Sequence, residues 1–168
     1  ELTKSYRSTV EILELAAAVS GEKTINCISR QGKMPVWYAA LDEEQMYTNL
    51  VQALNAMEDV ETAAVLCLDQ EMAECVSEEL KERMPQMEIS LLTKDTKTFK
   101  PGLCVTTFYL AKGLEFDAVM IPFLEKYRTA FHRQALYINI TRALHVCNLF
   151  SAGDSKGSLG DELTEYRV

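Results

Sequence analysis

Residues 62–85 read TAAVLCLDQEMAECVSEELKERMP, and two patterns in this stretch decide the fold. The first seven residues are almost entirely apolar, which is typical of a short strand covered on both faces in a parallel sheet. Asp69 follows at once and is expected to cap a helix that ends before Pro85. A buried strand that leads directly into a helix is part of a βαβ unit, so this stretch predicts a parallel sheet.

The same alternation of short apolar strands and amphipathic helices extends outward in both directions. Towards the amino terminus, Ser8 and Glu11 are expected to form a capping box for a first helix, and Asp42 is expected to begin a second. Towards the carboxy terminus, helices are expected over residues 131–142 and 159–166. The expected strands are residues 24–29, 36–41, 62–68, 88–92, 103–108, 118–122 and 145–151. The pattern therefore predicts an α/β chain with an open, mainly parallel sheet and helices on both faces.

The composition of the chain indicates the size of its core, its surface charge and the cell compartment that it suits. The chain has 168 residues, of which 48% are apolar, so a single domain over residues 1–168 can bury a well-filled core. Its formal net charge is −8, so any contact with nucleic acid must come from a local patch. No apolar run approaches the roughly 20 residues of a membrane span, and the five cysteines lie mostly in apolar runs, as reduced core thiols would. These features favour a cytoplasmic protein without a membrane partner.

Three segments carry residues suited to chemistry: LTKSYRST at residues 2–9, VTTFYLAKGLEFD at residues 105–117 and ALYINITRALH at residues 135–145. In this order they resemble motifs IV, V and VI of the UvrD/Rep family of superfamily 1 DNA helicases. The chain looks closest to the carboxy-terminal RecA-like motor domain of the helicase IV type, and the resemblance extends from Leu2 to Phe150. It implies a RecA-like, P-loop NTPase-type sheet that serves as the second motor domain of an ATP-dependent DNA helicase or translocase.

The motifs include two arginines of interest. A nucleoside triphosphate concentrates negative charge on its γ-phosphate, and guanidinium groups bind such charge through paired hydrogen bonds. The resemblance assigns this catalytic role to Arg7 and Arg142, an effect worth about 10³ to 10⁵ in rate where it has been measured. It also implies that Tyr6 stacks on the nucleotide base, that Glu115 binds the ribose and that Gly113 permits this approach. The alternative is that both arginines merely pair with nearby carboxylates at helix ends.

Further residues are candidates for contact with single-stranded DNA. By resemblance Thr107 and Tyr109 touch the strand, although a histidine commonly stands where this chain has Tyr109; a tyrosine can still stack or donate a hydrogen bond. The alternative is a plain strand-to-loop turn in which Glu115 is solvated and Tyr109 is packed. A basic cluster, formed by Lys94, Lys97 and Lys100, could follow a phosphate backbone or could simply be a solvated loop.

The chain lacks two parts that ATP hydrolysis requires. No segment matches GxxxxGK[ST], and no apolar strand ends in the acidic pair that would hold Mg²⁺. This polypeptide alone is therefore not expected to hydrolyse ATP. By resemblance, ATP with Mg²⁺ binds at the interface with an amino-terminal RecA-like domain of the same chain, and the present chain, which begins directly before its first motif, looks like a fragment of a larger protein.

Other features of the chain bear on what the parent protein does. The residues between Arg7 and Lys112 are already used by the expected strands and helices, which leaves no room for the 2B domain that UvrD and Rep carry there. Surface exposed at Tyr6, Leu110 and Tyr137 by removal of the partner domain predicts self-association of the fragment. Two alternatives remain open: a non-catalytic α/β interaction module that keeps the fold without nucleotide turnover, and a stand-alone small-molecule transferase.

Overall fold

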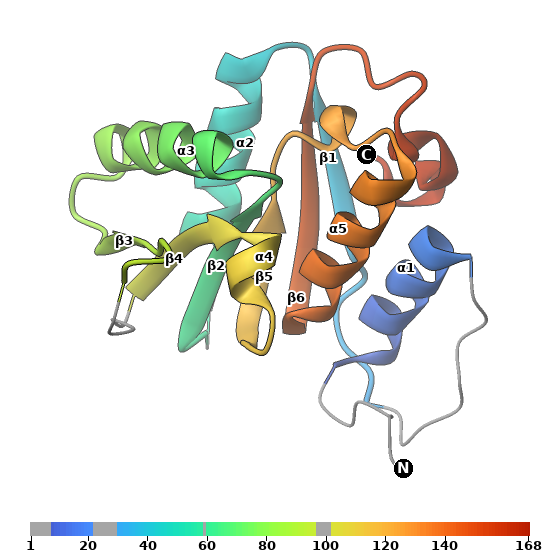
Figure 1. Cartoon of the computed structure of the whole chain (residues 1–168), viewed down its shortest axis with the longest axis horizontal. Helices are drawn as coiled ribbons and strands as arrows, with labels where there is room; N and C mark the ends of the chain where they lie inside the picture. Colours follow the sequence, from blue (N-terminus) through green and yellow to red (C-terminus); the bar gives the residue numbers. More distant parts are fainter. Residues whose placement is uncertain (1–7, 22–29, 59, 97–101) are drawn as a thin grey trace.

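The computed structural model describes residues 8–21, 30–58, 60–96 and 102–168, and within these ranges six strands form one sheet (Figure 1). The strands are β1 (Val36–Ala40), β2 (Thr62–Cys67), β3 (Ile89–Leu91), β4 (Gly102–Thr107), β5 (Phe116–Ile121) and β6 (Ala143–Ala152). Their order across the sheet is β1-β6-β5-β2-β4-β3, and every neighbouring pair is parallel. All strands therefore begin at one edge of the sheet, here called the amino edge, and end at the opposite carboxyl edge.

Helices cover both faces of this sheet, as predicted. They are α1 (Val10–Ser20), α2 (Glu43–Asn55), α3 (Gln70–Arg83), α4 (Phe108–Ala111) and α5 (Ala130–Thr141). Figure 1 shows α2 and α3 on one side of the sheet and α1 and α5 on the other, and each side has its own buried cluster. Val119 of β5 packs in the cluster of α1 and α5, whereas Met120 packs in the cluster of α2 and α3, because successive strand residues point to opposite faces. In the described ranges, no helix has the length and apolar character needed to span a bilayer.

Aspartate side chains begin two of the helices where the sequence predicts. The Asp42 carboxylate accepts a hydrogen bond from the Gln45 amide at 2.9 Å, and the Asp69 carboxylate accepts one from the Met72 amide at 2.8 Å. Each bond satisfies a backbone donor that has no partner within the first turn of the helix. The prediction that α2 and α3 start after these residues is confirmed.

The first helix begins one residue later than predicted. Its N-cap is Thr9 and not Ser8. The Thr9 hydroxyl accepts a hydrogen bond from the Ile12 amide at 3.4 Å. The Ser8 hydroxyl instead donates to the Ala143 carbonyl at 2.7 Å, at the start of β6. The Glu11 carboxylate also turns outward from the expected capping box and accepts a hydrogen bond from the Gly32 amide at 2.9 Å. Two tertiary contacts thus replace the predicted local box.

The carboxy-terminal segment also differs from its prediction. Residues 159–166 form two 3₁₀ turns, Leu159–Glu162 and Thr164–Tyr166, in place of one helix. The buried ring of Trp37 packs against this segment, so close to Gly160 that an added Cβ there would be 2.8 Å away. The Val168 amide then donates to the Trp37 carbonyl at 3.0 Å and ties the segment to β1. The predicted strand over residues 24–29 lies outside the described residues.

Candidate functional site

The amino edge brings the loop before β5 next to the end of α5. Helix α5 ends at Arg142, directly before β6. The Arg142 carbonyl accepts a hydrogen bond from the Phe116 amide at 2.9 Å, and Arg142 Nη1 lies 3.5 Å from the Leu114 carbonyl oxygen. Two of the predicted site residues, Gly113 and Glu115, flank Leu114 in that loop. The structure therefore brings three of the predicted nucleotide-site residues together from two distant motifs.

The guanidinium of Arg142 is positioned by neutral oxygens. Its Nε donates to the Ile138 carbonyl at 3.2 Å, and its Nη2 donates to the Thr141 hydroxyl at 3.3 Å. Both acceptors belong to the last turn of α5, where unpaired carbonyls favour a positive charge. Within the described ranges Arg142 has no carboxylate partner, so the helix-end ion pair considered as an alternative is not found there. The positive charge is held in place without being neutralised.

The loop before β5 depends on a glycine. Gly113 has a φ of +84°, a left-handed conformation that side-chain-bearing residues rarely adopt. A Cβ at this position would meet no atom within 4 Å, so the backbone turn and not a close approach requires glycine. The turn leaves the Glu115 side chain at the exposed surface of the amino edge.

The first motif reaches the same edge. The Ser8 hydroxyl donates to the Ala143 carbonyl at 2.7 Å, so the residue that begins the described chain contacts the residue that follows Arg142. Tyr6 and Arg7, the predicted base-stacking residue and the second predicted catalytic arginine, lie outside the described residues.

Arg30 is a residue at this edge that the sequence reasoning missed. Its Nη2 donates to the Leu144 carbonyl at 3.0 Å, two residues beyond Arg142. The sequence gives little indication that Arg30 reaches this edge. An arginine shortly before a glycine and a strand, as Arg30 is before Gly32, commonly marks an ordinary turn. Only the folded chain shows that this side chain reaches the start of β6.

A histidine and an aspartate complete the amino edge. His145 Nε2 lies 3.6 Å from Asp117 Oδ1, and the second Asp117 oxygen accepts hydrogen bonds from the Glu61 and Thr62 amides at 2.9 and 3.2 Å. These contacts join the starts of β2, β5 and β6. In the part of the chain that the structure describes, no group of three or more His, Cys, Asp or Glu side chains could hold a metal ion.

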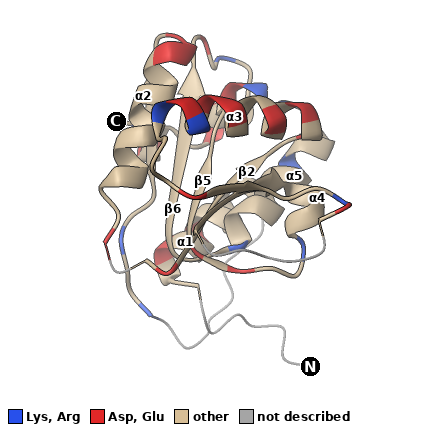
Figure 2. Cartoon of the chain, turned by 90° about the vertical axis from the view of Figure 1, so that its left-hand side faces the viewer, with Lys and Arg blue, Asp and Glu red and all other residues tan. Residues whose placement is uncertain are grey.

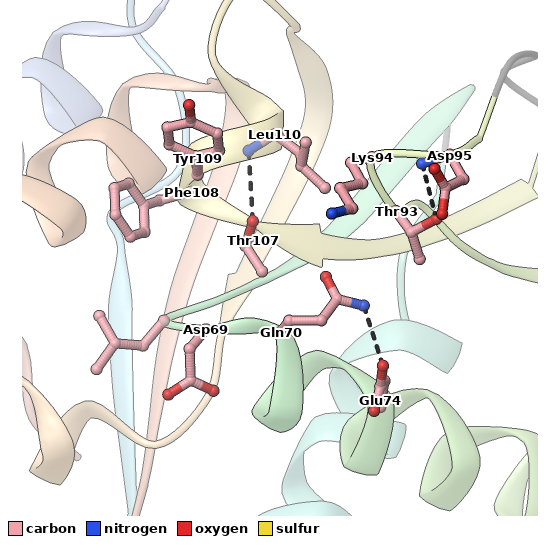
Figure 3. A pocket seen from close by; sticks show the side chains of 11 residues that line it. Asp69, Gln70, Glu74, Thr93, Lys94, Asp95, Thr107, Phe108, Tyr109 and Leu110 are labelled. Atoms are coloured by element: carbon pink, nitrogen blue, oxygen red, sulfur yellow. Dashed lines mark hydrogen bonds between the residues drawn. The ribbon is translucent and has the colours of Figure 1, made fainter.

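A second candidate site lies at the carboxyl edge. A cavity of about 550 Å³ opens between the ends of β2 and β4, with residues 68–70, Glu74 and residues 93–95 among its walls (Figure 3). Thr107 and Tyr109, the two residues predicted to touch single-stranded DNA, both line it. The Thr107 hydroxyl accepts a hydrogen bond from the Leu110 amide at 3.3 Å and so caps α4. Strand β4 therefore ends at Thr107, one residue before the predicted boundary.

Aromatic rings extend from this cavity towards α5. The Tyr109 side chain is 69% exposed, which contradicts the alternative that it is packed. Phe108 contacts it with ring centroids 6.5 Å apart, and Phe131, which is 63% exposed, lies 5.7 Å on the other side of Phe108. Lys112 Nζ lies 5.8 Å from the centre of the Tyr109 ring. We refer to Tyr109, Phe108 and Phe131 as the aromatic row.

Comparison with known proteins agrees with the resemblance carried by the three motifs. Residues 102–150 match the family described as UvrD-like helicase C-terminal domain, a span that includes the loop before β5 and Arg142. The structure also matches that of the C-terminal domain of a possible DNA helicase from Lactobacillus plantarum WCFS1, with a TM-score of 0.78 and 28% identity over 98% of both chains. The chain is thus similar to UvrD-like helicase C-terminal domains, in residues 102–150 by sequence and over nearly its whole length by structure.

More distant solved structures share the RecA-like fold of this chain. The C-terminal domain of the DEAD-box protein Dbp5 matches with a TM-score of 0.57 and 17% identity, over 80% of this chain and 88% of that one. Arterivirus nonstructural protein 10 (helicase), solved in complex with DNA, matches with a TM-score of 0.58 and 11% identity, over 94% of this chain and 37% of that one. At these identities the likeness concerns the fold alone. A search of curated protein sequences found no match.

Charge is unevenly distributed along the chain. Residues 96–153, from before β4 to the end of β6, contain seven Lys or Arg and three Asp or Glu, whereas the rest of the chain contains ten and twenty-two. Helix α5 has no acidic residue, while Figure 2 shows acidic residues along α3. Lys94 of the predicted basic cluster lines the cavity, and Lys97 and Lys100 lie outside the described residues. The local patch that an acidic chain needs for contact with nucleic acid is therefore expected on the side of α4 and α5.

The buried cysteines of the domain are unsuited to nucleophilic chemistry. Burial raises the pKa of Cys104 to about 11 and that of Cys147 to about 12. Burial also raises the pKa of Cys67. These thiols stay protonated at neutral pH, as the prediction of core thiols requires. Cys75 is exposed on α3, and Cys27 lies outside the described residues.

Proposed function

We propose that this domain is the second motor domain of a cytoplasmic ATP-dependent DNA helicase or translocase. In this proposal ATP binds between the amino edge and an amino-terminal RecA-like domain that supplies the phosphate-binding loop. The observation that carries the proposal is the Arg142 guanidinium, which is held beside the Glu115 loop and, among the described residues, hydrogen-bonds only neutral oxygens. Such a group can form paired, charge-assisted hydrogen bonds with phosphate oxygens.

The arginines would act on the γ-phosphate. Arg142 would stabilise the charge that develops during phosphoryl transfer, and Arg7 would share this role. Ser8 follows Arg7 directly, and the hydrogen bond from its hydroxyl to the residue after Arg142 supports the idea that the two arginines converge. Removing such an arginine typically costs about 10³ to 10⁵ in rate.

The remaining residues of the amino edge would bind the rest of the nucleotide. Glu115 would accept hydrogen bonds from the ribose hydroxyls, Gly113 would provide the turn that exposes it, and Tyr6 would stack on the base. The described residues contain no cluster suited to a metal ion, so in this proposal Mg²⁺ arrives with ATP and is held by the amino-terminal domain. Closure of the two domains on ATP would be converted into a step along the DNA.

Single-stranded DNA would cross the carboxyl edge. The exposed ring of Tyr109 offers a surface on which a base can stack, and the aromatic row continues this surface. The Thr107 hydroxyl oxygen already accepts one hydrogen bond, which leaves its hydrogen for a phosphate oxygen. The excess of basic over acidic residues in residues 96–153 supports an anionic partner on this side.

An ATPase assay on the longer protein that contains this domain tests the proposal. Arg142→Ala is expected to lower DNA-stimulated turnover by about 10³-fold or more, with an unchanged circular dichroism spectrum. The matched control is Arg128→Ala, because the Arg128 guanidinium also binds carbonyls, those of Glu125 and Lys156, but lies away from the amino edge. Unchanged turnover in Arg142→Ala would contradict the proposal and favour an interaction module without nucleotide turnover.

A further inference from the structure

Besides Arg142, the described part of the amino edge holds a second guanidinium that the motifs do not include. Arg30 lies before β1, and its Nη2 donates to the Leu144 carbonyl at 3.0 Å. Leu144 is two residues beyond Arg142, whose own guanidinium reaches the Leu114 carbonyl at 3.5 Å. Arg30 is thus bound to the short stretch of chain that begins with Arg142, although the two arginines lie far apart in the sequence.

The backbone around Arg30 is clamped to the first turn of α1. The Val10 amide donates to the Arg30 carbonyl at 2.9 Å, and the Gly32 amide donates to a Glu11 carboxylate oxygen at 2.9 Å. A Cβ at Gly32 would lie 2.6 Å from the Thr9 Cγ2 atom, so the two segments are in close contact. Because the Arg30 carbonyl and the Gly32 amide are both hydrogen-bonded to the first turn of α1, the backbone that carries the Arg30 side chain has a defined position.

Most of the hydrogen-bonding capacity of Arg30 is unused. A guanidinium has five N–H donors, and within the described ranges Arg30 uses one of them, to a carbonyl. Its Nε is buried and has no acceptor there. By contrast, Arg83 and Arg133 each bind a carboxylate, at 2.7 and 2.8 Å. A buried N–H donor without an acceptor is unfavourable, and Arg30, which is half-buried, has further N–H donors that can bind an anion.

We propose that Arg30 is a further phosphate-binding residue of the amino edge and binds the same nucleoside triphosphate as Arg142. This inference rests on the proposed function. The bond to the Leu144 carbonyl orients the planar guanidinium, and the donors left over can bind two phosphate oxygens at once. A lysine would lack the rigid planar fork that lets two N–H groups bind two oxygens of one phosphate.

The test measures binding of Mg²⁺-free inorganic tripolyphosphate to this chain by nuclear magnetic resonance. With arginine side chains labelled with ¹⁵N, the Nε–H signals of Arg30 and Arg142 are expected to shift together with one apparent Kd. Arg30→Gln keeps an amide donor for the Leu144 carbonyl but removes the charge, and is expected to weaken binding about tenfold. Arg128→Gln is the matched control and is expected to change the Kd little. Sodium chloride at equal ionic strength corrects for general screening.

Each possible result of this experiment either supports or overturns the role of Arg30. An unchanged Kd in Arg30→Gln, together with a loss of binding in Arg142→Gln, would overturn the role of Arg30 and leave the proposed function standing. Equal weakening by Arg30→Gln and Arg128→Gln would also overturn it, because binding would then follow net charge. Absence of saturable binding to the unaltered chain would overturn the role of Arg30, whereas the proposed function is tested by the ATPase assay on the longer protein, in which the amino-terminal domain is present. If Arg30→Gln fails to fold, the Nε–H signal of Arg30 in the unaltered chain decides, and no shift at saturation overturns the inference.

Discussion

Arg133 and Arg142 lie near opposite ends of α5, and their partners explain why only one of them is available to a phosphate. The Arg133 guanidinium forms two hydrogen bonds of 2.8 Å with the Glu162 carboxylate and a third, of 2.7 Å, with the Val19 carbonyl. It lowers the pKa of Glu162, so this ion pair adds stability at neutral pH that is lost as the pH falls through the lowered pKa. Arg142 has no such partner in the described ranges.

Tyr109 provides a prediction at the scale of one residue. Because stacking of a base on an aromatic ring contributes about 1 to 3 kcal/mol, Tyr109→Ala is expected to weaken binding of a fluorescent oligothymidine by roughly fivefold to a hundredfold. Fluorescence anisotropy measures this Kd. Tyr137→Ala is the matched control, since Tyr137 is also an exposed tyrosine, at 38%, and makes no contact with the aromatic row in the described structure.

An abasic strand of equal length separates stacking from charge. It keeps the phosphates and loses the bases, so Tyr109→Ala should change its Kd little. If Tyr109→Ala weakened binding of the abasic strand as much as that of oligothymidine, the residue would act through something other than stacking.

At the scale of one element, the packing of α1 depends on a close contact between the Gly32 backbone and the Thr9 side chain. Gly32 fits against Thr9 only because it has no Cβ, and its amide binds Glu11 at the start of the same helix. Since Ser8 in turn binds the start of β6, this contact positions the segment that leads out of the first motif. The amino-terminal end of α1 is thus held by contacts with residues that lie far from the helix in the sequence.

Gly32→Ala is expected to destabilise the domain by about 1 to 3 kcal/mol, because its methyl group would overlap the Thr9 Cγ2 atom. Thr9→Ser removes that Cγ2 and keeps a hydroxyl that can cap α1, so alone it should cost little. The double variant should recover much of the loss, which urea denaturation of the four proteins measures as a coupling free energy. Additive effects would show that the Thr9 methyl group is not the obstacle.

At the scale of the whole molecule, one short segment connects the two proposed sites. Strand β4 ends at the carboxyl edge with Thr107, and β5 begins at the amino edge with Phe116. Between them, α4 and the Gly113 loop run from the cavity lined by Tyr109 to the edge that holds Arg142. The two proposed sites are therefore separated by only a few residues of chain.

The isolated chain is expected to self-associate, because exposed aromatic side chains on its α4 and α5 side would be left without a partner. Tyr109, Phe131 and Tyr137 are 69%, 63% and 38% exposed, and Leu110 is half-buried between them and the cavity. Light scattering should show the mean mass rising with protein concentration. Phe131→Ser should reduce this rise, and a constant monomer mass over the whole range would contradict the prediction.

Local patterns in the sequence determined the main features of the fold. The apolar runs predicted the strands of the parallel sheet, and Asp42 and Asp69 marked the starts of α2 and α3, since a cap needs only residues a few positions apart. The motifs likewise indicated the family and the residues of the loop before β5.

Only the tertiary structure decided which groups meet at the amino edge. The bonds from Ser8 to Ala143 and from Arg30 to Leu144 join residues 135 and 114 positions apart. No local pattern encodes such contacts, because they form only when α1, the segment before β1 and the end of α5 are all packed against the same sheet. For that reason the sequence could indicate Arg142 as a candidate, while Arg30 became a candidate only in the folded chain, which also makes Thr9 the N-cap of α1.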